Sequence, residues 1–119
     1  MRCVKVRDVL DMLECTVEAG AGGLDNEVKC GYASDLLSDV MAHARDGDIW
    51  VTVQAHENII AVATLVGLAA IVVAGGVECQ PEAARRADEE GIPLLRTRLP
   101  AFEVVGRLYA AGVRGRTGS

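Results

Sequence analysis

The segment around His56 contains side chains that could bind a polar ligand or transfer a proton. His56 follows a strand-like stretch, with Gln54 before it and Glu57 and Asn58 after it. An imidazole exchanges a proton near neutral pH, and the neighbouring side chains can hydrogen-bond a polar ligand. Residues adjacent in a chain need not face one site, so a helix cap with solvent-facing polar groups is the competing interpretation.

A second candidate is the pair of carboxylates Asp35 and Asp39, which are four residues apart with Ser38 between them. On one helical face such a pair could hold Mg²⁺ beside phosphate oxygens. The simpler interpretation places Ser34 or Asp35 at the start of a helix, where it caps the first turn and complements the helix dipole. We expect the cap.

Gly75 and Gly76 end an apolar strand and precede a helix. Two glycines there could let the backbone approach a phosphate, with the helix N-terminus supplying N–H groups. The sequence has no G-x-G-x-x-G and no G-x-x-x-x-G-K-[ST], and its last lysine is Lys29. Neither a dinucleotide fingerprint nor a P-loop is present, so ordinary turn chemistry is the alternative.

No motif of specific enzyme or metal chemistry occurs. The sequence contains neither G-x-S-x-G nor C-x-x-C, and its cysteines are widely spaced without a Cys/His cluster. We therefore expect reduced structural thiols, no metal and no other cofactor. The main expectation is a protein without catalytic activity. A small hydrolase or phosphotransfer enzyme that uses His56 with Asp35 or Glu57 is the less favoured alternative.

Hydrophobic periodicity predicts strands that alternate with helices. Helices are expected over residues 6–13, 35–45, 58–66 and 82–90 and from residue 100 onward, and strands over 15–19, 28–33, 49–54, 70–74 and 92–95. This order predicts an α/β fold, a three-layer sandwich with a mostly parallel central sheet of about five strands flanked by helices. The first two strands could pair antiparallel, because no helix links them.

The last helix should carry Phe102, Val105, Leu108 and Tyr109 on one face. We expect one domain over residues 1–112, followed by a flexible C-terminal tail over residues 113–119. Ligands of parallel sheets bind beyond the carboxyl ends of the strands. The candidate ligand-binding residues are accordingly Ser34, Asp35, Ser38, Gln54, His56, Asn58, Gly75, Gly76 and Thr97.

The composition excludes several classes of protein. Of the 119 residues, half are apolar and only 3% are aromatic, and the net charge of −5 argues against nucleic acid as a partner. Residues 59–77 carry no charge, but acidic Glu57 and Glu78 flank them, so we expect a buried helix and strand and no membrane span. Charges at Arg2, Lys5 and Arg7 interrupt any signal sequence. We expect a cytoplasmic protein.

Four segments, LDNEV at 24–28, GYASDLLSDVM at 31–41, GDIWVT at 47–52 and EGIPLL at 90–95, carry a family resemblance. Over about residues 3–111 the chain resembles the DRTGG domain family. It is similar in kind to small stand-alone bacterial members, which look like the N-terminal domain of HPr kinase/phosphorylase without its kinase domain. The motif that names the family is not spelled out, and residues 54–57 take the place of the family's Gly-Asp-Arg segment.

The resemblance implies regulation. DRTGG domains occur inside phosphotransacetylases and between the CBS domains of some inorganic pyrophosphatases, and they are similar to the uridine-nucleotide-binding domains of muramyl ligases. Stand-alone members often accompany iron-hydrogenase or two-component signalling genes, and the family's domains commonly self-associate. The apolar helix over residues 58–66 is compatible with a deep core or a dimer seam.

We therefore expect a non-enzymatic regulatory or ligand-sensing module that binds a nucleotide or phosphorylated metabolite at the strand ends. The implied assembly is a homodimer, with a possible protein partner in a redox or signalling system. The alternative is a protein–protein adaptor or accessory subunit without a small-molecule ligand.

Overall fold

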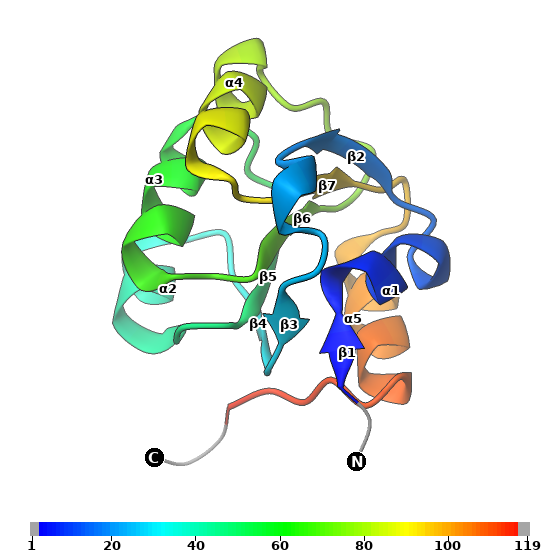
Figure 1. Ribbon diagram of the computed structural model, residues 1–119. Helices are drawn as coiled ribbons and strands as arrows, with labels where there is room; N and C mark the ends of the chain where they lie inside the picture. Colours follow the sequence, from blue (N-terminus) through cyan, green and yellow to red (C-terminus); the bar gives the residue numbers. More distant parts are fainter. Residues whose placement is uncertain (1–2, 117–119) are drawn as a thin grey trace.

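The centre of the computed structural model, which describes residues 3–116, is a five-stranded sheet (Figure 1). Its strands are β2 (Thr16–Ala19), β4 (Gly31–Ala33), β5 (Ile49–Thr52), β6 (Ala70–Val73) and β7 (Leu94–Arg96). They lie in the order β2-β7-β6-β5-β4, with β4 to β7 mutually parallel and β2 antiparallel to β7. The predicted mostly parallel sheet is confirmed.

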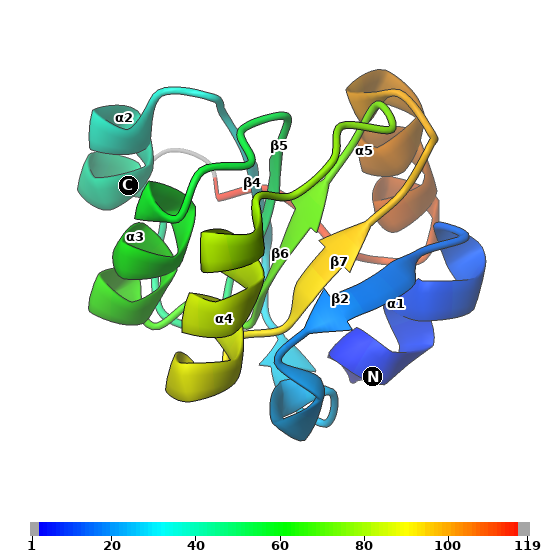
Figure 2. The ribbon, with the colours of Figure 1, turned by 90° about the horizontal axis from the view of Figure 1, so that it is seen from above.

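Helices cover both faces of this sheet (Figure 2). One face carries α2 (Leu37–His43), α3 (Asn58–Val66) and α4 (Pro81–Glu90), and the other carries α1 (Val6–Met12) and α5 (Ala101–Ala110). Side chains alternate along β6, so that Ile71 and Val73 pack toward α3 while Val72 packs toward α5. The predicted three-layer sandwich is therefore confirmed.

The uncharged stretch of residues 59–77 forms the middle of the fold. It supplies most of α3, then the central strand β6, all four of whose residues are buried. Gly67 ends α3 at a φ of +85°, where a Cβ would collide with the Asp46 carboxylate. Within residues 3–116, no helix is long and apolar enough to cross a membrane.

The N-terminal third differs from the prediction. The expected strand over residues 28–33 is two strands, β3 (Glu27–Val28) and β4, which belong to different sheets. β3 pairs antiparallel with β1 (Val4–Lys5), and a 3₁₀ turn η1 (Ala21–Gly23) follows β2. The suggested pairing of the first two strands is wrong, because Val28 joins the cluster around α1 while β2 pairs with β7.

α5 presents a different face to the sheet from the one predicted. Val104 and Leu108 are buried, whereas Phe102 is 91% exposed, Tyr109 57% and Val105 41%. The helix is rotated because Val104 and Leu108, one turn apart, fit against the core of small side chains that includes Val51 and Leu95. Three large apolar side chains are left facing outward.

The segment after α5 also differs from the expected free tail. Val113 is buried, and the Arg114 carbonyl accepts a 2.9 Å hydrogen bond from the Gly31 amide. Arg116 pairs with Asp48, which is completely buried, at 2.8 Å. A buried carboxylate requires such a partner, so residues 113–116 are held against the domain. Residues 117–119 of the predicted tail lie outside the described residues.

Candidate functional site

The carboxyl ends of β4, β5, β6 and β7 lie at one edge of the sheet, where Asp35 joins two strand ends. One Asp35 carboxylate oxygen accepts hydrogen bonds from the Thr52 hydroxyl and the Val53 amide, each at 2.9 Å. The Gln54 side-chain amide donates to the Asp35 carbonyl at 3.1 Å. The predicted residues Asp35 and Gln54 are thus brought together, and they bind each other and the end of β5.

These bonds change the role expected for Asp35. α2 begins at Leu37, with Leu36 as its N-cap residue and no side-chain cap. The Asp35 carboxylate turns instead to two donors at the end of β5, so the predicted helix cap is wrong. Ser34 accepts the Leu36 amide at 3.2 Å, and Ser38 is exposed in the first turn of α2. Since Asp35 is outside α2, it shares no helical face with Asp39.

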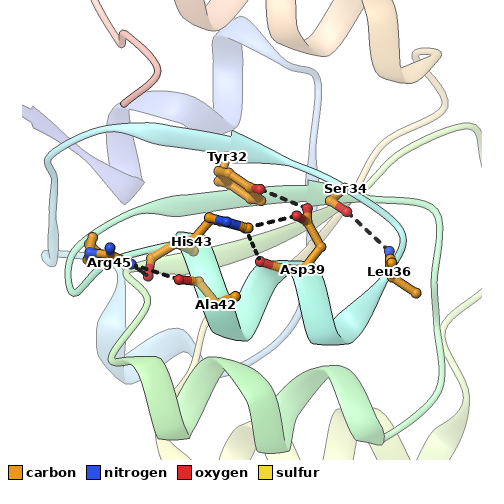
Figure 3. A network of polar contacts seen from close by, with 8 residues as sticks. Tyr32, Ser34, Leu36, Asp39, Ala42, His43 and Arg45 are labelled. Atoms are coloured by element: carbon orange, nitrogen blue, oxygen red, sulfur yellow. Dashed lines mark hydrogen bonds and ion pairs between the residues drawn. The ribbon is translucent and has the colours of Figure 1, made fainter. Parts of the chain in front are cut away.

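Asp39 belongs to a separate polar cluster on α2 (Figure 3). Its carboxylate accepts a hydrogen bond from the Tyr32 hydroxyl at 2.7 Å and lies 3.0 Å from Nδ1 of His43. The bond from Tyr32, followed by one from Ser34, lowers the pKa of Asp39 below its usual value. The same Tyr32–Asp39 bond raises the pKa of Tyr32.

His56 directly precedes α3, whose N-cap residue is Glu57. Its Nδ1 accepts the backbone N–H of Asn58 at 3.1 Å, and its ring is exposed. Glu57 pairs with Arg86 on α4 at 3.8 Å. Among residues 3–116, neither Asp35 nor Glu57 hydrogen-bonds the His56 ring. The acid–base pair needed for the enzymatic alternative is therefore not assembled.

The two glycines after β6 form a turn with φ values of +76° and +73°. The Gly75 amide donates to the Leu99 carbonyl at 2.8 Å, and the Gly76 amide donates to the Thr97 carbonyl at 2.9 Å. The Gly76 carbonyl accepts a bond from Arg96 at 3.1 Å. Because both amides already have main-chain partners, this turn does not offer them to a phosphate.

Thr97 is a buried link between β7 and the N-terminal helix. Its hydroxyl donates to the Leu13 carbonyl at 2.7 Å and accepts the Leu99 amide at 3.2 Å. The hydroxyl thereby fixes the segment that leaves β7, which also receives the Gly75 and Gly76 amides.

A cavity of about 220 Å³ opens beside Thr97 at the end of β7. Its lining consists of Glu14, Thr16, Arg96, Thr97, Arg98 and Leu99. Arg96 is partly engaged by the Val77 and Gly76 carbonyls, whereas exposed Arg98 has no hydrogen bond or ion pair to any residue within 3–116. The cavity therefore presents one uncommitted guanidinium group, the type of group that binds phosphate or carboxylate.

Glu14, on the rim of this cavity, is the only non-glycine residue between 3 and 116 with a positive φ, at 54°. It follows α1 at a position where glycine is usual. Its carboxylate pairs with Arg107 of α5 at 3.1 Å. The ion pair joins α1 to α5 and offsets the negative charge of Glu14 beside Arg98.

Two of the cysteines are partly buried near this edge. Burial raises the pKa of Cys15 to about 12 and that of Cys79 to about 11. Both thiols are protonated at neutral pH, which makes them poor nucleophiles and poor ligands. Within the described chain no three His, Cys, Asp or Glu side chains are grouped so as to hold a metal ion.

Comparison with known proteins identifies the fold family. The sequence profile of the DRTGG domain matches residues 8–111. This chain belongs to the DRTGG domain family. The match covers most of the chain and confirms the family predicted from its sequence segments. No curated protein matches the chain.

A solved structure with the same fold supports the assignment. It holds the CBS and DRTGG domains of the regulatory region of Clostridium perfringens pyrophosphatase, complexed with the activator diadenosine tetraphosphate. The TM-score is 0.72 at 17% sequence identity, over 87% of this chain and 45% of that one. This DRTGG domain therefore spans less than half of the chain it resembles.

The cavity of this DRTGG domain includes residues that sequence reasoning missed. Of the predicted set only Thr97 lines it, whereas Arg96, Arg98 and Glu14 were not singled out. Two arginines flanking a threonine at a strand end, R-T-R, are a visible signal. The positive φ of Glu14 has no such signal, because glycine is the residue that usually marks this position after a helix.

Proposed function

We propose that this DRTGG domain is a non-enzymatic regulatory module that binds a small phosphorylated ligand at the carboxyl end of β7. The observation that supports the proposal is the cavity beside Thr97 with the uncommitted guanidinium of Arg98. Arginine binds phosphate through paired N–H donors, and the Arg107–Glu14 ion pair limits repulsion from the one acidic wall.

The size of the cavity limits what it can enclose. Pockets that bury a whole drug-sized ligand have volumes of about 300–1,000 Å³, and this one has about 220 Å³. A phosphate group with part of a sugar fits, so the remainder of a nucleotide would lie across the surface. Because the similar pyrophosphatase region was solved with diadenosine tetraphosphate, adenine nucleotides are the first ligands to test.

The other strand-end residues remain a second proposal. Ser34, Asp35, Gln54, His56 and Asn58 form the far part of the same edge, around the ends of β4 and β5. These five residues would contact a ligand only if the ligand extended from the cavity past Gly75 and Gly76. Substituting them therefore tests how far the bound ligand extends.

A thermal-shift screen of adenine nucleotides, uridine nucleotides and acyl phosphates tests the proposal. A ligand at a hundredfold excess over its Kd stabilises the folded state by about 2.7 kcal/mol, which raises the Tm of a domain of this size by on the order of 10 °C. We expect Arg98→Ala to abolish the shift. Arg85→Ala, which removes another exposed arginine on α4, is the matched control and should retain it.

A flat screen would overturn the proposal, as would a shift that Arg98→Ala leaves intact. In the second case, loss of the shift in His56→Ala or Asp35→Ala would move the site to the ends of β4 and β5.

A protein–protein adaptor without a small-molecule ligand is the second candidate function. It is favoured by the internal bonds of Asp35, Gln54, Gly75, Gly76 and Thr97, which leave few free polar groups along most of the edge. Binding of a purified redox or signalling partner that Arg98→Ala, His56→Ala and Asp35→Ala leave unchanged, together with a flat ligand screen, would support the adaptor.

We further propose that the module acts as a homodimer, as the family resemblance implies. The helix first considered as a seam, α3, has most of its apolar side chains in the core. Only Leu65, at 74% exposure, presents a large apolar group to solvent from this helix.

A further inference from the structure

The outer side of α5 carries an uncharged stripe that the fold of one copy does not use. Phe102, Val105, Gly106 and Tyr109 follow a spacing of three and four residues, which places them on one side of the helix. Phe102, Val105 and Tyr109 are the exposed large apolar residues of this helix. α5 lies at the outside of the helix layer that it forms with α1 (Figure 2).

An apolar groove lies directly beside the stripe. It has a volume of about 90 Å³, and its lining includes the small residues Gly31 and Ala33 of β4 together with Val105, Tyr109 and Val113. α5 packs on β5, so β4 is left without a helix over this face. A protruding ring, Phe102, and an open groove therefore stand side by side on one surface.

Gly106 adds an independent observation. Glycine inside a helix costs about 1 kcal/mol relative to alanine, and a Cβ at Gly106 would meet nothing within 4 Å in this chain. Nothing inside the domain requires a glycine there. A glycine on an exposed helix face does allow another backbone to approach closely.

We propose that this stripe and groove form the seam between two copies of the chain, related by a two-fold axis with their α5 helices antiparallel. This assignment rests on the homodimer proposed above and adds the surface that forms it. A two-fold contact needs a patch that is complementary to itself. Antiparallel pairing places Phe102 against Tyr109 and the groove of the other copy, and Val105 against Gly106 of the other copy.

The charges at the two ends of the stripe favour this antiparallel arrangement. Glu103, half exposed and paired with Arg107 of its own helix at 3.1 Å, adjoins Phe102 at the start of the helix, whereas the Arg114 guanidinium lies over the Tyr109 ring, 3.9 Å from its centroid. Two antiparallel copies bring opposite charges together at both ends, and their helix dipoles also oppose each other. A chain with a net charge of −5 would thus meet its copy on a stripe that carries no charged residue.

The area of the stripe sets the expected strength. The exposed parts of Phe102 and Tyr109 amount to about 300 Å², against about 800 Å² per partner in a stable interface. The contact is therefore smaller than a standard interface even when the groove is added, and we expect weak, reversible association.

Sedimentation equilibrium from about 1 µM to about 1 mM covers the range in which such an interface dissociates. We expect the wild-type chain to change from monomer to dimer, and Phe102→Glu to weaken the Kd by at least about tenfold. Leu65→Glu is the matched control, because Leu65 is also highly exposed but belongs to α3. It should dimerise like the wild type.

Gly106→Leu separates association from folding. Since its side chain meets open space within one copy, it should keep or raise the Tm of the monomer while preventing the close approach of two helices. A wild-type chain that stays monomeric would overturn both the homodimer and the seam. Dimers of Phe102→Glu and Gly106→Leu that are as tight as wild type, or loss of the dimer in Leu65→Glu alone, would overturn only the seam. The thermal-shift screen tests ligand binding alone, so its result does not bear on the dimer.

Discussion

Arg116 pairs with Asp48 through a guanidinium-to-carboxylate distance of 2.8 Å, and Asp48 is completely buried. The Arg45 amide donates a further bond of 2.9 Å to the same carboxylate. Asp48 in turn raises the pKa of Arg116. The pair anchors residues 113–116 beneath the start of β5.

Arg116→Ala should lower the free energy of unfolding by about 2 kcal/mol, because it leaves a buried carboxylate with one remaining partner. Urea unfolding measures the loss. Adding Asp48→Asn should recover part of it, since the amide carries no charge. Arg85→Ala, an exposed arginine without such a contact, should change stability by less than about 0.5 kcal/mol. An equal loss in both single variants would contradict the anchoring role.

Tyr32→Phe should raise the pKa of Asp39 toward its ordinary value, because the Tyr32 hydroxyl is the main cause of its lowering. The carboxylate favours the folded state above its ordinary pKa, and this contribution disappears as the pH falls through the lower folded pKa. Carboxyl-carbon NMR titration measures the change, with Tyr109→Phe as control. The same titration curve in Tyr32→Phe and wild type would refute the hydrogen bond.

In the native protein, alkylating reagents should label exposed Cys3 first and Cys15 and Cys79 slowly, because their raised pKa values of about 12 and 11 keep them protonated. Above the ordinary value of 9.0 the unfolded chain loses these protons while the folded chain keeps them. Stability should therefore fall as the pH rises through this value. Mass spectrometry of labelled peptides measures the rates, with urea-unfolded protein as the control. Labelling of Cys15 as fast as Cys3 in the native protein would contradict the prediction.

Replacing Glu14 should distinguish its backbone from its side chain. Glu14→Ala loses the ion pair with Arg107 and keeps the unfavourable positive φ, whereas Glu14→Gly loses the pair but relieves the backbone. We expect the glycine variant to be more stable than the alanine variant by about 1 kcal/mol. Thermal unfolding that ranks alanine above glycine would contradict the left-handed conformation.

Gly20→Ala should be severely destabilising, whereas Gly22→Ala, two residues away, should be nearly neutral. Gly20 has a φ of +75°, and a Cβ there would collide with the Ile92 carbonyl. A Cβ at Gly22 meets nothing within 4 Å. A loss of more than about 3 kcal/mol in Gly20→Ala is expected from a clash and strain together. Chemical unfolding of both variants makes the comparison. Similar unfolding midpoints would argue against the close approach of Gly20 to the Ile92 carbonyl.

The features of the fold that the sequence predicts well are local. The uncharged run interrupted by Gly67 predicts α3 and β6, and Pro81 and Gly91 delimit α4. The division of residues 28–33 between two sheets has no local signal, because it depends on Val28 pairing with Val4 from the start of the chain. The rotation of α5 depends likewise on which side chains the finished core can accept.

The sequence predicts that the candidate site lies at the carboxyl ends of the strands. It does not predict what most of the side chains at this edge of the sheet bind. Parallel strands determine that Asp35, Gln54, Gly75 and Thr97 lie at one edge. Whether each group is free depends on neighbours distant in sequence, such as Thr52 for Asp35 and Leu13 for Thr97. Arg98 was overlooked because its significance lies in the cavity beside it.

β4 is the last strand on its side of the sheet, and such a strand offers unpaired N–H and C=O groups to other extended chains. Residues 113–116 lie along the free edge of β4. Gly115 forms a parallel bridge with Gly31, and the Gly31 amide donates to the Arg114 carbonyl. Residues 113–116 thus shield the open margin of the sheet from strand-to-strand aggregation. Shortening the chain before Val113 would remove this shield together with the partner of Asp48, and we expect the product to precipitate where the full chain stays dispersed.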